Sequence, residues 1–430
     1  MNLDVQKMRK TNTKIFPTYK SLSWDYLFFY TIDFLFLTQI KGFSASDVVL
    51  KSTFYSLFMI LMQIPANIII EFLGRKNSII FGNVLNCFYL LIVMMSKSLG
   101  DIIFAEFISA IAFALKTIAE PSLLSESIAP SKYKSKIYAR VNGKGSTGYY
   151  ALNAISKVVA GFLFTINSYL PIICSLIICI IVVLISMIFI EPVQKKKKGS
   201  DAILYKKELK DIKEGFIYVV KSERLKALIL CSALMVSLLS ILSNYYVSLF
   251  EDLNISAITI GIIAAVGCII SSYASKTQQK IQDTFKNKTL ITIAILLSIS
   301  TIISGILGIN NKGYITLIVI ITIMYLIYQF GHGAYYTMIE KYLSNFSNEK
   351  IDTKIFATSN LFSGCVRVMA GLCASFLLGK FTTAYCMIIV GIIFTVIYIL
   401  VEKYMNKRVG LKPEEYSKEE TKYDSIIHKQ

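Results

Sequence analysis

The chain has 430 residues, of which 55% are hydrophobic and 17% are charged, and its formal net charge is +18. Soluble domains carry about 25% charged residues, so this composition excludes an ordinary soluble enzyme and favours a membrane protein. The positive charge does not indicate a nucleic-acid partner, because the basic residues lie between or beyond long apolar stretches instead of forming one patch.

The apolar stretches are roughly 20 to 28 residues long, and about 20 helical residues cross a hydrocarbon core of about 30 Å. Such stretches must be helical, because backbone groups find no water inside a bilayer. The predicted fold class is therefore an all-α membrane protein with 12 transmembrane helices. They are expected near residues 21–39, 46–71, 77–97, 100–125, 137–165, 169–190, 225–249, 255–275, 289–308, 313–337, 353–379 and 381–403.

The predicted helices form two sets of six, joined by a long linker. We expect a cytoplasmic N-terminal tail at 1–20, a first six-helix bundle at 21–190, the linker at 191–224, a second bundle at 225–403 and a cytoplasmic C-terminal tail at 404–430. The linker opens with the basic run from Lys195 to Lys198 and continues with apolar residues at helical spacing. This pattern predicts an amphipathic helix on the cytoplasmic face, lying either on the membrane surface or against the bundle.

The orientation of the chain follows from its basic residues, which mark the cytoplasmic loops of membrane proteins. Most lysines and arginines fall in the two tails, in the linker and in alternate loops between the predicted helices. Both termini are therefore predicted to be cytoplasmic.

The two predicted bundles share a short sequence pattern. Lys157 in the fifth helix and Arg367 in the eleventh are each followed by an Ala-Gly pair at the same spacing. Two six-helix sets with a cytoplasmic hinge are typical of a transporter with two pseudo-symmetric halves.

A charged motif lies between the second and third predicted helices, and it resembles the signature of the major facilitator superfamily. That signature is Gly, three residues, Asp, two residues and then Gly-Arg-Lys/Arg. Asn67 stands here for the leading glycine, and the other matching positions hold Glu71, Gly74, Arg75 and Lys76. The stretch from Glu120 to Ser127, at the end of the fourth helix, also resembles a block that is common in bacterial members.

The resemblance implies two bundles that rock around a site at the membrane midplane, in a bacterial inner membrane. It also implies that the motif closes the cytoplasmic side in one conformation and opens in the other. Gly74 gives the turn its backbone freedom. Arg75 presents a bidentate fork to a carboxylate, for which Glu126 is the candidate partner, and Glu71 completes the cluster. The alternative is a static ion cluster in a loop.

Three departures weigh against drug/proton antiport in particular. Multidrug antiporters of this family carry an arginine early in the fourth helix, where Glu106 stands here. They carry a Gly-Pro pair in the fifth helix, and the residues from Asn142 to Phe164 include no proline. Close relatives often have a glutamate before the proline of the second helix, where Gln63 stands here, and glutamine cannot carry a proton.

Ionisable residues inside membrane spans are costly and are functional candidates. Helices 1, 4, 7 and 10 line the cavity in the family that the chain resembles, so the resemblance makes Asp33, Lys116, Glu120 and His332 the cavity candidates, with the uncharged Asn244 and Gln329 beside them. We expect Asp33 to carry the proton, with a permanent Asp–Lys bridge as the alternative reading. His332 either titrates or is a hydrogen-bonded packing residue.

The pair formed by Lys157 and Arg367 suggests an outer gate or an anion site, and snorkelling to the headgroups is the alternative. The sequence has no phosphate-binding loop, no metal-ligand cluster and no nucleophile–base pattern, so we expect neither an enzyme nor a cofactor. The leading prediction is a monomeric secondary transporter in which the proton gradient drives export of a small amphipathic compound. The runner-up is uptake or exchange of a small organic anion, and a non-transporting role is the third alternative.

Overall fold

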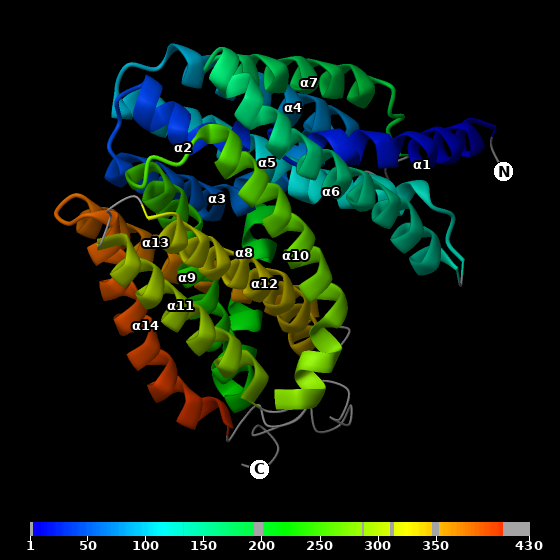
Figure 1. The fold of residues 1–430 in the computed structure, drawn as a ribbon. Helices are drawn as coiled ribbons and strands as arrows, with labels where there is room; N and C mark the ends of the chain where they lie inside the picture. Colours follow the sequence, from blue (N-terminus) through cyan, green and yellow to red (C-terminus); the bar gives the residue numbers. More distant parts are fainter. Residues whose placement is uncertain are drawn as a thin grey trace. The chain divides into compact units, whose positions relative to one another are not determined.

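The computed structural model describes residues 3–131, 133–192, 201–285, 288–309, 314–345 and 352–406. Within these ranges the regular structure is entirely helical, without a strand (Figure 1). The helices are α1 (Leu3–Ser23), α2 (Phe29–Leu35), η1 (Phe36–Ile40), α3 (Ala45–Leu73), α4 (Arg75–Met95), α5 (Leu99–Ser127), α6 (Lys134–Ile166), α7 (Leu170–Met187), α8 (Asp201–Lys221), α9 (Glu223–Asp252), α10 (Ala257–Phe285), α11 (Thr289–Ile309), α12 (Ile315–Asn345), α13 (Asp352–Leu378) and α14 (Thr383–Asn406). The predicted all-α membrane fold is confirmed.

Eleven of the described helices are long and apolar enough to cross a membrane. They correspond to the predicted helices two to twelve. The expected first helix, at residues 21–39, is not continuous. Its outer part is the short helix α2 followed by the π-helical turn η1, and its inner part belongs to α1.

The break in the first helix lies between Trp24 and Phe28. The carboxylate of Asp25 accepts a hydrogen bond from the backbone N–H of Tyr26, at 2.7 Å, and so competes with the helical pattern. Phe28 has a φ of 66°, which residues other than glycine seldom adopt. The chain therefore turns out of the helix here and starts a new one at Phe29.

The residues expected to form the N-terminal tail are mostly helical, because α1 has an apolar face that is buried. Phe16 and Tyr19 are 1% and 0% exposed, and the Tyr19 ring packs against Phe189 with centroids 5.1 Å apart. Asn12 adds hydrogen bonds to Ser127 and to the backbone oxygen of Ile190, both at 2.8 Å. Because this segment has many polar residues, its average hydropathy is low and does not indicate the buried apolar face.

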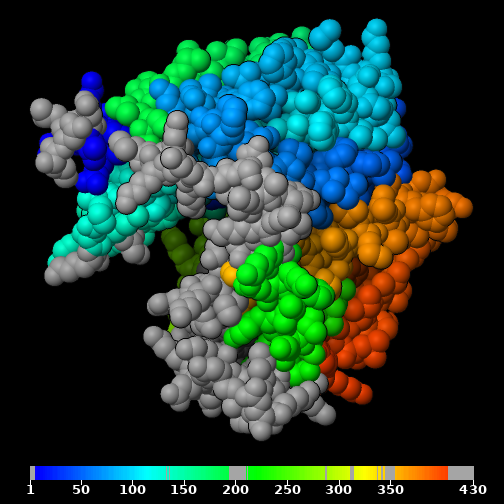
Figure 2. Space-filling model, turned by 180° about the vertical axis from the view of Figure 1, so that it is seen from behind, coloured from blue at the N-terminus to red at the C-terminus, as the bar shows by residue number. Residues whose placement is uncertain are grey.

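The chain divides into two compact units. The first holds residues Met1–Phe43, Phe54–Lys206 and Ala257–Ala265, and the second holds Ser44–Thr53, Lys207–Ser256 and Val266–Gln430. In the first unit α4 packs on α5 and α7, and α1 packs on α6. Atoms of α3, α4 and α5, coloured from blue to cyan, form a continuous surface in Figure 2.

In the second unit α11 packs closely on α14, and α9 on α13. Small residues permit the first of these contacts. A Cβ atom added to Gly305 would lie 2.6 Å from the backbone oxygen of Ala384, and one added to Gly391 would lie 2.9 Å from that of Ser298. Glycine at these positions lets the two helix backbones approach each other, as is common between membrane helices.

The linker contains the helix α8, which packs against α13 within the second unit. A Cβ atom on Gly215 would lie 2.6 Å from the backbone oxygen of Lys354, so the two helices nearly touch there. The Lys354 ammonium also forms an ion pair with Glu214, at 2.5 Å. Val219 is buried, whereas Phe216, Ile217 and Val220 are exposed. The run from Lys195 to Lys198 and the C-terminal tail from residue 407 lie outside the described residues.

Candidate functional site

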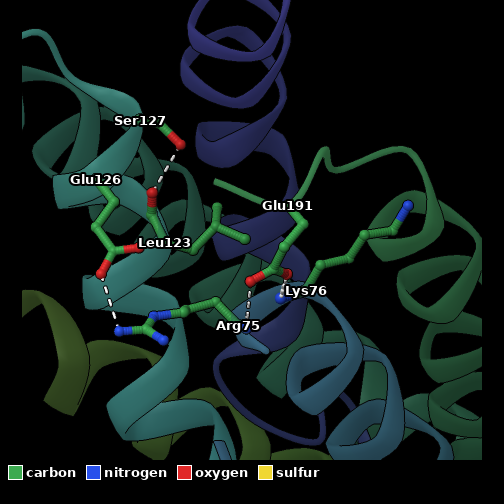
Figure 3. Close-up of polar contacts among 6 residues, drawn as sticks. All are labelled: Arg75, Lys76, Leu123, Glu126, Ser127 and Glu191. Atoms are coloured by element: carbon green, nitrogen blue, oxygen red, sulfur yellow. Dashed lines mark hydrogen bonds and ion pairs between the residues drawn. The ribbon is translucent and has the colours of Figure 1, made fainter. Parts of the chain in front are cut away.

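The junction between α3 and α4 is a tight turn at Gly74, whose φ is 86°. The carboxylate of Glu191, which follows α7, covers this turn (Figure 3). Its two oxygens accept hydrogen bonds from the backbone N–H groups of Arg75, at 2.8 Å, and Lys76, at 2.6 Å. The first N–H groups of a helix have no partner within it and carry a partial positive charge, so the carboxylate is a favourable cap for α4.

Gly74 is needed here for two separate reasons. Its positive φ disfavours any residue with a Cβ atom. In addition, a Cβ atom would lie only 2.8 Å from Oε1 of Glu191. The glycine therefore permits both the turn and the approach of the capping carboxylate.

The predicted partner of Arg75 is in place. Its Nη2 atom lies 3.0 Å from Oε1 of Glu126 at the end of α5, with the two side chains 21% and 38% exposed. Glu71 is exposed on α3, and the Lys76 side chain points away from the cluster (Figure 3). The carboxylates that meet the motif are therefore those of Glu126 and Glu191.

Glu191 is the residue of this junction that the sequence analysis missed. It is far from the motif along the chain and matches no position of the family signature. The signal that was available is its place as an acid directly after the sixth apolar stretch, beside Pro192. Only the packing of α7 on α4 shows where it points.

A second polar group is buried inside the first unit, around α5. The carboxylate of Glu120 accepts a hydrogen bond from the Tyr19 hydroxyl, at 2.8 Å. Asn83 in turn donates to the Tyr19 oxygen, at 3.0 Å. The ammonium group of Lys116, which is 3% exposed, donates to the backbone oxygen of Ser23 at the end of α1.

Lys116 and Glu120 lie one turn apart on α5, but they are not joined by an ion pair in the described part of the chain. Each is instead held by a neutral group of α1. Glu120 nevertheless acts electrostatically on Lys116, and so does Asp25. Lys116 is therefore coupled electrostatically to both acids without a direct ion pair to Glu120.

The helix-1 acid that joins this group is Asp25, not the predicted Asp33. Asp25 accepts a hydrogen bond from the Tyr149 hydroxyl of α6, at 3.2 Å, and both Lys157 and Lys116 act on it electrostatically. Asp33 lies beyond the helix break, on α2, where it acts on Tyr89. A continuous helix was assumed in the sequence analysis, and the break changes which acid faces α5 and α6.

Three aromatic rings surround the break in the first helix. The Trp24 ring lies 4.9 Å from Tyr149 and 5.8 Å from Tyr150, measured between centroids. The Lys20 ammonium lies 4.6 Å from the centre of the Trp24 ring and donates to Asn142, at 2.5 Å. Trp24 and Lys20 are functional candidates that the sequence analysis did not name.

In the second unit, the predicted polar residues of α12 lie beside tyrosine rings of the same helix. His332 lies 4.8 Å from Tyr336 and 6.3 Å from Tyr328, between ring centroids. Gln329 donates to the Tyr325 hydroxyl, at 2.6 Å. The structure therefore groups the predicted residues His332 and Gln329 with tyrosines of their own helix.

Two other predicted residues of the second unit, Asn244 and Arg367, differ in the contacts that they make. Asn244 donates to the backbone oxygen of Ser240 in its own helix, at 3.5 Å, which is a local contact. Arg367 acts electrostatically on Tyr336, and its Nε atom is buried without a hydrogen bond. It has no carboxylate partner among the residues that the structure describes.

The family model of the Major Facilitator Superfamily matches residues 23–350. The chain belongs to the major facilitator superfamily. It is thus a membrane-embedded transporter with a small-molecule substrate rather than an enzyme.

Solved structures agree with this assignment at the level of the fold. A nucleoside transporter is 12% identical with a TM-score of 0.69, covering 93% of this chain and 99% of that one. A peptide transporter in complex with alafosfalin is 10% identical with a TM-score of 0.70, covering 96% and 100%. A D-xylose–proton symporter is 12% identical with a TM-score of 0.66, covering 92% and 98%. Among curated proteins no sequence matches the chain.

Proposed function

We propose that this major facilitator protein uses a proton gradient to export a small amphipathic compound by alternating access. The observation that carries the proposal is the set of groups that surround the Glu120 carboxylate. This carboxylate lies inside a membrane-spanning helix, its partner is the neutral hydroxyl of Tyr19, and it forms no ion pair among the described residues.

A carboxylate in this position is suited to gain and lose a proton. An ionised group without a counter-charge in contact is costly inside a membrane, and protonation removes that cost. Lys116 lies one turn away and acts on Glu120 electrostatically, without a direct bridge. The protonation of Glu120 therefore depends on the charges around it, which a bound solute changes.

Asp25 is the second acid that we assign to proton coupling. Its hydrogen bond to Tyr149 links the broken first helix to α6, so a change in its protonation alters a contact between two helices. Asp33, predicted from the sequence as the proton carrier, stays a candidate for the same role. Replacing each of the three acids in turn by its amide distinguishes which of them takes part in proton coupling.

A second candidate function, uptake or exchange of a small organic anion, is favoured by Arg367. An arginine stays charged in proteins, and this one has no carboxylate partner in the described part of its unit. Lys157, its counterpart by sequence, lies near Asp25 in the first unit. An anionic solute would supply the counter-charge that Arg367 lacks.

The experiment is a flux assay in proteoliposomes with a pH-sensitive dye in the lumen. Lipophilic cations and small organic anions are added in turn to vesicles containing the wild type or Glu120→Gln. We expect one compound to move protons with the wild type only, while Glu120→Gln still exchanges that compound across the membrane without a pH gradient. Solute flux that leaves the lumenal pH unchanged would overturn proton coupling, and the sidedness of the driving gradient gives the direction.

A further inference from the structure

The linker helix α8 carries an exposed apolar patch. Its members Phe216, Ile217 and Val220 are 55%, 42% and 47% exposed, whereas Val219 is 7% exposed. Val220 lies four residues after Phe216 and three after Ile217, so the three side chains are neighbours on the helix surface. Because α8 is not among the described helices that are long and apolar enough to cross a membrane, the lipid around a span does not account for this patch.

The place of α8 within the second unit brings the patch to the start of two membrane spans. The helix leads through Ser222 directly into α9, and a Cβ atom on Gly215 would lie 2.6 Å from the backbone oxygen of Lys354 in α13. Glu223 and Lys354 are the first residues of two apolar stretches that are long enough to span a bilayer. A helix held beside the starts of two spans lies at the boundary of the bilayer.

Basic side chains accompany the patch. Lys210, Lys213 and Lys221 are exposed on α8, and Lys213 lies one turn before Ile217. Lys210 pairs with Glu214 at 3.9 Å, whereas Lys213 is in no ion pair among the residues that the structure describes. Apolar side chains flanked by lysines are the pattern of a helix that lies in the surface of an anionic membrane, where lysine stems reach the phosphates.

We propose that α8 binds the surface of an anionic bilayer. Phe216, Ile217 and Val220 lie below the lipid headgroups, and the Lys213 ammonium contacts a lipid phosphate. Contact with α13 does not compete with this binding, because Gly215 makes that contact and the patch stays exposed. The inference goes beyond the proposed function, since it depends neither on the substrate nor on the proton.

The test places a fluorescent reporter on the patch. The chain contains a single tryptophan, so Trp24→Phe supplies a dark background into which Phe216→Trp is introduced. The full-length protein is placed in nanodiscs that contain brominated phosphatidylcholine, with or without phosphatidylglycerol. Quenching by the brominated acyl chains is compared with quenching by acrylamide in water. The control is Tyr218→Trp in the same background, because positions two residues apart lie on different faces of a helix.

We expect brominated chains to quench the Phe216→Trp reporter about twice as strongly as the Tyr218→Trp control. Quenching of the Phe216→Trp reporter is expected to increase when phosphatidylglycerol is present, because the lysines attract an anionic surface. Lys213→Gln is expected to remove most of that increase. Lys280→Gln, which changes an exposed lysine of α10, is expected to leave the increase intact.

Three results would overturn the proposal. Quenching of the Phe216→Trp reporter by acrylamide and not by brominated chains would mean that the patch lies in water. Protection from both quenchers would mean that protein covers it. Equal quenching by brominated chains in the two kinds of nanodisc would show that the surface does not recognise anionic lipid. Ile217→Trp provides a second reporter on the same patch if Phe216→Trp does not fold.

Discussion

At the scale of single residues, the buried group around α5 shows how charge is kept in the membrane without bridges. Lys116 is held by the Ser23 backbone oxygen and Glu120 by the Tyr19 hydroxyl. Hydrogen bonds to neutral groups satisfy the charged atoms but leave their net charges uncompensated by contact. This is why we propose that a proton or a solute acts on this group.

The first prediction compares three acids of the first unit. Glu120→Gln is expected to abolish proton-coupled transport, Asp25→Asn to reduce it at least tenfold, and Asp33→Asn to change it less than either. The reason is that Asp25 and Glu120 share the electrostatic environment of Lys116, whereas Asp33 lies beyond the helix break. Transport is measured in proteoliposomes with and without an imposed pH gradient. Loss of pH dependence in Asp33→Asn alone would return the role to Asp33.

Individual site residues were predictable where the pattern was local and uninterrupted. The pairing of Arg75 with Glu126 followed from a family motif and a helix end, and the structure contains it. Glu120 and Lys116 followed from charge inside an apolar stretch. Asp25 was not chosen as a cavity candidate, because its orientation depends on the break after Ser23. Glu191 was missed because its contact with α4 is made only by tertiary packing.

At the scale of an element, the start of α4 combines a turn that glycine permits with a capping carboxylate that follows α7. Arg75 and Lys76 donate their backbone N–H groups to Glu191, and hydrogen bonds to a charged group contribute about 1.5–3 kcal/mol each. The third predicted helix therefore starts at a defined residue.

The second prediction uses a matched pair of glycines with positive φ. Gly74→Ala is expected to lower the free energy of unfolding by about 3 kcal/mol, because it adds backbone strain and displaces Glu191. Gly42→Ala, with a φ of 73° and no atom near the added Cβ, is expected to cost about 1 kcal/mol. Unfolding is followed by circular dichroism in detergent. Equal losses in the two variants would show that Glu191 does not stabilise the turn.

The third prediction concerns Arg75 and Glu126, for which we propose the role of a conformational latch. Arg75→Glu and Glu126→Arg are each expected to shift the balance between inward- and outward-open forms, and the double variant to restore it in part. Because the pair is partly exposed, its contribution to stability is about 1 kcal/mol or less, so folding is expected to persist. Labelling of single cysteines on the two faces measures the balance. Unchanged labelling in both single variants would contradict a latch.

Most helices were predictable as elements because length and hydropathy suffice for a continuous span. The first helix was not, since its inner half, α1, is rich in lysine and its outer half is interrupted. Charge in α1 is tolerated because Phe16 and Tyr19 are buried in the core while Lys7, Lys10 and Lys14 are exposed. A hydropathy window averages over both faces and misses this division.

At the scale of the whole molecule, the chain is a multi-pass protein of two compact units, and its orientation remains a prediction from the basic loops. The fourth prediction is that alkaline phosphatase fused after Gln430 is inactive and a fluorescent protein fused there is bright, which indicates a cytoplasmic C-terminus. Phosphatase fused between α11 and α12 is expected to be active, since that loop then lies outside. The opposite pattern would invert the topology.

The central claim is that proton movement and solute movement are coupled through Glu120. The most direct measurement is the lumenal pH of proteoliposomes after addition of a transported compound, recorded in parallel for the wild type and Glu120→Gln. We predict a pH change that follows solute flux in the wild type and is absent in Glu120→Gln, while the variant still exchanges solute at equilibrium. Identical pH changes in the two proteins, or solute flux in the wild type without any pH change, would contradict the claim.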